Sequence, residues 1–144
     1  MRRAVWAILL CAMMACSREA PPLADAPKRQ RAPNRDSMGF IDIPVDGATV
    51  DPYIRVTGWA VDESGVKGVR IYFDDELMVT APLVTQRPDI NDKYPQFAKP
   101  DALHGFEAIV DAGAHVGYTK IRAVAMDGRG AQSQIYSVNV KIRE

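Results

Sequence analysis

The chain has 144 residues, 18 basic and 18 acidic side chains, and therefore no net charge. Residues 39–144 alone carry 11 basic and 15 acidic side chains, a net charge of 11 − 15 = −4. Nucleic-acid binding needs a clustered basic face, so this balance argues against nucleic acid as a partner. The length is that of one domain of ordinary size.

The first segment, MRRAVWAILLCAMMAC, has the layout of an export signal. Arg2 and Arg3 precede an apolar stretch of 12 residues, 4–15, whereas a membrane-spanning helix needs about 20. The shorter length is typical of the apolar region of a signal peptide, and we predict a signal peptide over residues 1–15. A buried helix of a folded core is the less favoured alternative, because the sequence becomes polar abruptly at Ser17.

The end of this segment, MMAC, resembles the lipobox of bacterial lipoproteins. In that family a small residue precedes the cysteine that becomes the lipidated N-terminus, as Ala15 precedes Cys16. Cys11 is a poorer match because Leu10 precedes it. The resemblance implies acyl chains on Cys16, which would hold the protein firmly on a membrane. Ser17 after the cysteine implies the outer membrane if the cell is Gram-negative.

Residues 17–38, SREAPPLADAPKRQRAPNRDSM, contain four prolines and almost no large apolar side chain. Such a segment buries too little surface to offset the entropy lost on ordering. We therefore predict a lipidated cysteine followed by a disordered linker over residues 16–38. Its arginines either contact anionic lipid headgroups or keep the linker soluble, and the second interpretation is favoured.

From Gly39 onward apolar residues alternate with polar ones, which is the period of a β-strand with one buried face. In the second such run Ile54, Val56 and Ala60 share one face, and Trp59 lies on the other. Turn residues separate the runs at fairly even spacing, and no run has a convincing helical period. The sequence therefore predicts an all-β antiparallel sandwich over residues 39–144. Its seven expected strands lie within 39–44, 53–62, 68–76, 77–81, 105–111, 119–130 and 135–142.

Four stretches of this region, VTGWAVDESGVKGVRIYFDD, RPDINDKYP, HGFEAIVD and AVAMDGRG, resemble a bacterial immunoglobulin-like (Ig-like) domain. The resemblance covers about residues 39–142 and implies an Ig-like β-sandwich of about seven strands. It also implies an extracytoplasmic binding or spacer module, without naming a ligand.

Constellations of catalytic residues are missing from the sequence. The two histidines, His104 and His115, stand beside glycine-containing turns, where we expect solvated side chains. Both cysteines belong to the signal region, so residues 39–144 contain no thiol nucleophile, zinc-binding thiolate or disulfide. No glycine-rich phosphate loop occurs either. We therefore predict a protein that is not an enzyme and that has no resident cofactor.

Acidic residues gather in three connections that a sandwich places at the same end, namely 62–65, 82–104 and 127–130. Converging carboxylates can hold calcium, but aspartate at the end of a strand more often caps a turn. Turn caps and ion pairs to Arg87 or Arg129 are therefore favoured over a calcium site, and no metal is assigned. The predicted cluster consists of Asp62, Asp127, Arg87 and Asp89, with Glu63, Asp92 and Asp101 nearby.

The connection over residues 85–106, TQRPDINDKYPQFAKPDALHGF, is far longer than a usual strand-to-strand loop. Pro88 suits the first position of a helical turn. Three apolar side chains follow at positions i, i+4 and i+7: Ile90, Tyr94 and Phe97. We predict that they anchor the segment across the open end of the sandwich as a packed lid. Arg87 would then pair beneath it with Asp62 or Asp127, and a ligand-binding loop is the alternative.

These features lead to the hypothesis of a lipid-anchored, non-enzymatic Ig-like module that acts in binding or assembly at the bacterial cell envelope. The acyl chains provide its membrane contact, and its partner is an envelope protein or a glycan. The alternative is a carbohydrate-recognising accessory module, in which exposed Trp59 and Tyr72 stack on sugar rings.

Overall fold

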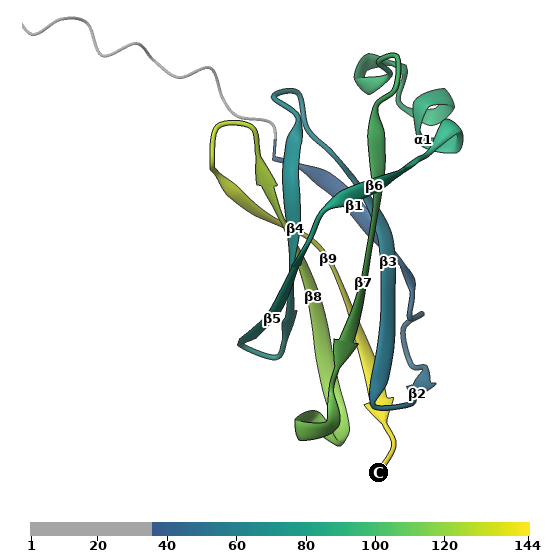
Figure 1. Ribbon diagram of the computed structural model, residues 1–144, viewed down its shortest axis with the longest axis vertical. Coiled ribbons are helices and arrows are strands. Elements are labelled where there is room, and N and C mark those ends of the chain that lie inside the picture. The colour runs from purple at the N-terminus through teal and green to yellow at the C-terminus, as the bar shows by residue number, and fades with distance from the viewer. Residues whose placement is uncertain (1–35) are drawn as a thin grey trace, which may run out of the picture. The chain divides into compact units, whose positions relative to one another are not determined.

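The computed structural model describes residues 36–144, so the predicted signal peptide, Cys16 and most of the predicted linker lie outside the described residues. The described chain forms two β-sheets that pack face to face (Figure 1). Within residues 36–144 there is no helix with the length and apolar character required to cross a membrane.

Each sheet is assembled from strands that are far apart in the sequence. The first sheet consists, in spatial order, of β1 (Met38–Ile43), β3 (Tyr53–Val61), β7 (Leu103–Asp111) and β6 (Leu83–Gln86). The second consists of β2 (Thr49–Val50), β9 (Gln132–Ile142), β8 (Gly117–Asp127), β4 (Val66–Phe73) and β5 (Glu76–Ala81). All pairings are antiparallel except that of β2 with β9. The predicted all-β antiparallel sandwich is thereby confirmed.

Two of these strands, β2 and β6, were not predicted. β2 has only two residues, and β6 begins directly after Pro82 within what the sequence suggested was one long connection. The connection between β6 and β7 is therefore residues 87–102, which we call the lid segment. It contains the short helix α1 (Pro88–Lys93) and the 3₁₀ turn η1 (Pro95–Phe97). A second 3₁₀ turn, η2 (Gly113–His115), joins β7 to β8.

The space between the sheets is filled by the apolar faces that the period-two pattern indicates, and we call this cluster the main core. Gly58 belongs to the inner face of β3, and its missing side chain leaves room for the ring of Phe106 and the carbonyl of Phe40. The main core includes Ile41, Ile54, Val56, Val69, Ile71, Phe73, Phe106, Val110, Ile121, Val138, Val140 and Ile142.

The first strand departs from simple alternation. Ile41 is buried, whereas Ile43, expected on the same face, is half exposed. The cause is a register shift between these two residues in the pairing of β1 with β3. β1 begins at Met38, and Ser37 before it is already buried. β1 forms one edge of the first sheet and stops just before Pro44, which has no N–H to donate to a ladder.

Candidate functional site

Three connections meet at one end of the sandwich, which we call the loop end. They are the turn after β3, the lid segment and the hairpin between β8 and β9 (Figure 1). This is the grouping that the alternation of strand directions predicts. The turn and the hairpin touch directly, since Gly128 donates its backbone N–H to the carbonyl of Gly65 and to the Ser64 hydroxyl. A side chain at position 128 would collide with the Ser64 backbone, so glycine is needed for this close approach.

Apolar side chains fix the lid segment to the first sheet. α1 ends where Tyr94 donates its N–H to the carbonyl of Ile90, and η1 follows at once. The rings of Tyr94 and Trp59 lie 5.5 Å apart, and those of Tyr94 and Phe97 lie 6.5 Å apart. We call this group, which is separate from the main core, the lid cluster: Trp59, Val61, Ile90, Tyr94 and Phe97.

The lid cluster lies on the outer face of β3. Trp59 and Val61 alternate along the strand with Ala60, which belongs to the main core, so they point away from the interior. The three anchor residues therefore pack against the outer face of the first sheet, and Phe97 also reaches the open end of the sandwich, where the prediction put all three. Trp59 is only 9% exposed. The ring of Tyr72, the other aromatic side chain expected to stack on sugars, has the guanidinium of Arg122 over it, 5.1 Å from the ring centre. The expectation that Trp59 is exposed for stacking on sugars is therefore wrong.

Arg87, at the start of the lid segment, has other partners than the predicted Asp62 or Asp127. Its guanidinium binds Asp89 in α1 at 2.7 and 2.8 Å and Asp42 in β1 at 2.6 Å. β1 and β6 are opposite edges of the first sheet, so this side chain spans the strands between them. Gly105 in β7 makes room for it, because a side chain there would press on Thr85 and Arg87.

This ion-pair group changes the protonation equilibria of its members. The hydrogen bonds to Asp89, and then the contact with Asp42, raise the pKa of Arg87 against the opposing effect of burial. The hydrogen bond from Arg87 lowers the pKa of Asp89. Both charges are therefore maintained over the whole physiological pH range, and the group fixes α1 to the far edge of the sheet.

Asp62 and Asp127 act as caps in the two loops that touch. Asp62 accepts hydrogen bonds from the N–H and hydroxyl of Ser64, at 2.7 and 2.6 Å, and from the hydroxyl of Ser37. Asp127 accepts the N–H groups of Arg129 and Ala131. Within residues 36–144 no three acidic, histidine or cysteine side chains are placed to hold a metal ion. The hydrogen bonds of Asp62 and Asp127 described above belong to the turns, and those of Asp89 belong to the Arg87 group.

His104 is the loop-end residue whose role sequence reasoning missed. It lies in β7 and is only 8% exposed, whereas a solvated side chain was expected. Its Nε2 lies 3.0 Å from the side-chain oxygen of Asn91, and its ring also hydrogen-bonds the backbone of Phe97. Burial lowers its pKa, so the ring is neutral near pH 7. The histidine therefore links β7 to both helical turns of the lid segment.

His115 is not solvated either, since its ring packs edge-on against Phe73 and its Nε2 lies 3.4 Å from a carboxylate oxygen of Glu76.

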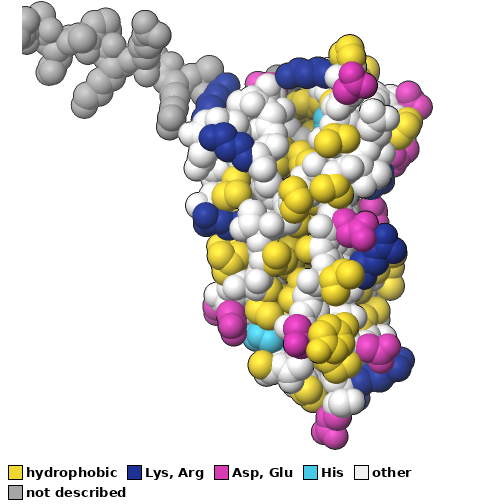
Figure 2. All heavy atoms as spheres, in the orientation of Figure 1, with side chains coloured by type: hydrophobic (Ala, Val, Ile, Leu, Met, Phe, Trp, Pro, Cys, Tyr) yellow, Lys and Arg dark blue, Asp and Glu magenta, His cyan; other side chains and the backbone are white. Residues whose placement is uncertain are grey.

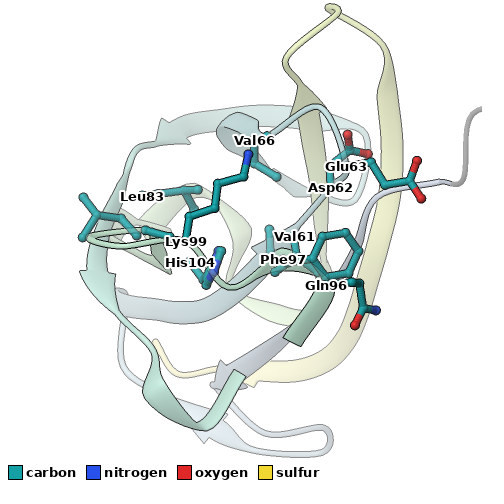
Figure 3. A pocket seen from close by; sticks show the side chains of 13 residues that line it. Val61, Asp62, Glu63, Val66, Leu83, Gln96, Phe97, Lys99 and His104 are labelled. Carbon is teal, nitrogen blue, oxygen red and sulfur yellow. The ribbon is translucent and has the colours of Figure 1, made fainter. Parts of the chain in front are cut away.

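A cavity of about 200 Å³ opens at the loop end, between the edges of the two sheets and beneath the later part of the lid segment (Figure 3). We call it the loop-end pocket. In the surface view, apolar side chains gather around a hollow in this part of the domain (Figure 2). A second cavity, of about 300 Å³, lies on the other side of Phe97 and includes Asp36 and Tyr94. Residues that line the loop-end pocket include Ala60, Val61, Glu63, Val66, Leu83, Phe97, Lys99, Leu103 and His104.

Comparisons with known proteins identify the fold. No protein-family model and no curated protein matches the sequence. Among solved structures the chain is similar to the fibronectin(III)-like modules of Clostridium thermocellum CbhA, with 21% sequence identity and a TM-score of 0.52. The similarity covers 74% of this chain and 96% of that chain. The domain therefore has the fold of a fibronectin III-like module, which shares the sandwich architecture of Ig-like domains.

Proposed function

We propose that this chain is a lipid-anchored, non-enzymatic Ig-like module that binds or assembles with another component of the bacterial cell envelope through its loop end. The observation that carries the proposal is the loop-end pocket. It lies where loops converge on a rigid sandwich, the usual position of binding residues in such folds. Its lining mixes apolar side chains with a few polar ones, as binding pockets do.

The anchoring part of the proposal rests on the lipobox-like MMAC, which lies outside the described residues. If Cys16 is the acylated residue, Cys16→Ser will abolish acyl labelling and move the protein from the membrane fraction to the soluble fraction. Cys11→Ser is the matched control and will leave both properties unchanged. A Cys16→Ser protein that remains labelled and membrane-bound would disprove lipidation at this position.

The binding part can be tested by site-specific photocrosslinking in intact envelopes. A photoreactive amino acid at Gln96 would sit between the two loop-end cavities, because this exposed residue lines both. Tyr118 provides the control, since it is 86% exposed at the start of β8, near the other end of the sandwich. We expect a discrete crosslinked product from position 96 and none from position 118. Equal products from both sites, or none, would contradict a loop-end binding function.

The carbohydrate alternative predicts a glycan partner in place of a protein. This alternative needs exposed aromatic side chains, and one of the two on which it was based, Trp59, is buried. A glycan array probed with the full chain would revive it, if one glycan class binds and binding depends on Tyr72.

A further inference from the structure

The size of the loop-end pocket limits its occupant to one small group. At about 200 Å³ it is smaller than the roughly 300–1,000 Å³ of pockets for drug-sized ligands. A cavity of about 150 Å³, however, is enough to hold a benzene molecule. The pocket therefore fits a single branched or aromatic side chain, and not a nucleotide or a sugar ring with its substituents.

The wall of the pocket favours an apolar occupant. Large apolar side chains contribute to its lining, namely those of Val61, Val66, Leu83, Phe97 and Leu103. The one ring with polar atoms, that of His104, is occupied by its hydrogen bonds to Asn91 and to the backbone of Phe97. An apolar group entering here gains by burial, whereas a polar group must replace the hydrogen bonds that it loses with water.

One cation at the mouth of the pocket, Lys99, can meet an anion beside that apolar group. The side chain of Lys99 extends over the cavity, and its ammonium group points toward Val66 (Figure 3). Within residues 36–144 its ammonium group makes no ion pair or hydrogen bond. Two acidic residues also line the pocket. The carboxylate of Asp62 keeps its charge but already accepts hydrogen bonds from Ser37 and Ser64, and Glu63 has a partner of its own. Lys99 is thus the cation of the lining that can pair with an anionic ligand.

We propose that the loop-end pocket binds the C-terminal residue of a partner protein, with its apolar side chain in the cavity and its carboxylate on Lys99. This inference rests on the proposed binding function and specifies the chemistry of the partner. A chain terminus fits better than an internal acidic residue for a geometric reason. In an extended chain the next side chain on the same face is two residues, about 6.6 Å, away, whereas a terminal carboxylate and its side chain share one Cα atom.

The proposal can be tested with fragments that separate the two recognised groups. The ¹⁵N-labelled full chain in detergent micelles is titrated with N-acetyl-L-leucine, its C-terminal amide and N-acetylglycine, and backbone NMR shifts are followed. We expect N-acetyl-L-leucine to bind with a dissociation constant on the order of millimolar and to shift Val66, Leu83 and Leu103. The amide should bind up to about fivefold more weakly, as one exposed ion pair is lost. N-acetylglycine should not bind.

Two variants place the effect in the pocket. Lys99→Gln should bind the acid and the amide equally, whereas Lys67→Gln, an exposed lysine outside the lining, should keep the wild-type preference. Ala102→Phe should fill the cavity and abolish binding of both fragments. Its thermal midpoint, measured in parallel, shows whether the domain remains folded.

Three results would overturn the proposal: no shift with N-acetyl-L-leucine, equal binding of acid and amide to the wild type, or equal binding of N-acetylglycine. None of them bears on crosslinking from position 96, which tests the proposed function separately. If position 96 forms a crosslink but the fragments do not bind, the loop end has a partner, and that partner is not recognised through a C-terminal residue.

Discussion

The main core and the lid cluster are both apolar, but they are assembled differently. The main core joins the inner faces of both sheets, and its large side chains, such as Phe73 and Phe106, are almost fully buried. The lid cluster joins the outer face of one strand to a connection, and Tyr94 and Phe97 in it are only partly buried. Elements with few buried contacts open with a smaller free energy than the whole domain. The lid segment should therefore open locally while the sandwich stays folded.

The largest expected effect comes from truncating the main core. Phe73 is fully buried, so Phe73→Ala should lower the free energy of unfolding by about 3–5 kcal/mol. That is a large share of the roughly 5–15 kcal/mol that stabilises a typical domain. Urea denaturation measures the loss. Tyr118→Ala, which truncates an 86% exposed ring, is the control and should change stability by no more than about 0.5 kcal/mol.

Truncating the lid cluster should cost less and act locally. Tyr94 is half buried against Trp59, so we expect Tyr94→Ala to cost about 1.5–2.5 kcal/mol, roughly half the value for a buried aromatic. Amide exchange should accelerate at Ile90 and Asn91 but not at Phe106.

The exposed Asp92 offers a control for this experiment, and Asp92→Asn should leave both stability and exchange near wild type. If Tyr94→Ala accelerated exchange in β7 as much as in α1, the lid cluster and the main core would be one cooperative unit.

The pH dependence of stability should come in part from His104. Burial lowers its pKa in the folded state, so below the unfolded pKa of about 6.5 the unfolded chain binds more protons. The stabilisation is thus fully present above about pH 6.5 and is lost as pH falls toward the folded pKa, with a slope of at most about 1.4 kcal/mol per pH unit.

Urea midpoints at pH 7.5 and 5.5 measure this loss. His104→Gln should reduce the difference between the two midpoints, since glutamine keeps hydrogen-bonding ability but does not titrate in this range. An unchanged difference would show that other groups carry the pH dependence.

The smallest effect is expected from the ion pairs. Arg87→Gln should cost up to about 1 kcal/mol, because its side chain is partly sheltered and binds two carboxylates. The loss should shrink in high salt. Arg55, which pairs with Glu107 and is more exposed than Arg87, is the matched comparison, and Arg55→Gln should leave the midpoint nearly unchanged. Equal losses from both variants would contradict a special role for the pair between Arg87 and Asp42.

The local sequence pattern was sufficient to predict those strands, faces and helix starts that depend only on residues nearby in the chain. The alternation of Ile54, Val56 and Ala60 identified β3 and its inner face, and Pro88 identified the start of α1. The same reasoning fails where the outcome depends on how distant elements fold back. It put Trp59 correctly on the outer face of β3, but the burial of that face depends on where the lid segment lies. The partner of Arg87 depends likewise on the bare backbone of Gly105.

One error could have been avoided. Phe106 and Val110 share the buried face of β7, and counting two residues back from Phe106 along the same face reaches His104. The pattern thus contained the signal for its burial. The next residue, Gly105, instead suggested that His104 stands beside a turn.

β1 and β9 run in the same direction, from the loop end to the other end of the sandwich, and this determines how the domain bears mechanical load. β1 starts at the loop end, where Met38 faces Val61, and β9 finishes at the other end, where Ile142 faces Gly117. A pull on the two ends of the domain therefore runs along these strands. Ladder hydrogen bonds lie across the strand direction, so the bonds joining β1 to β3 and β9 to β8 are sheared together and not opened one by one. Such a geometry resists extension along the strand direction.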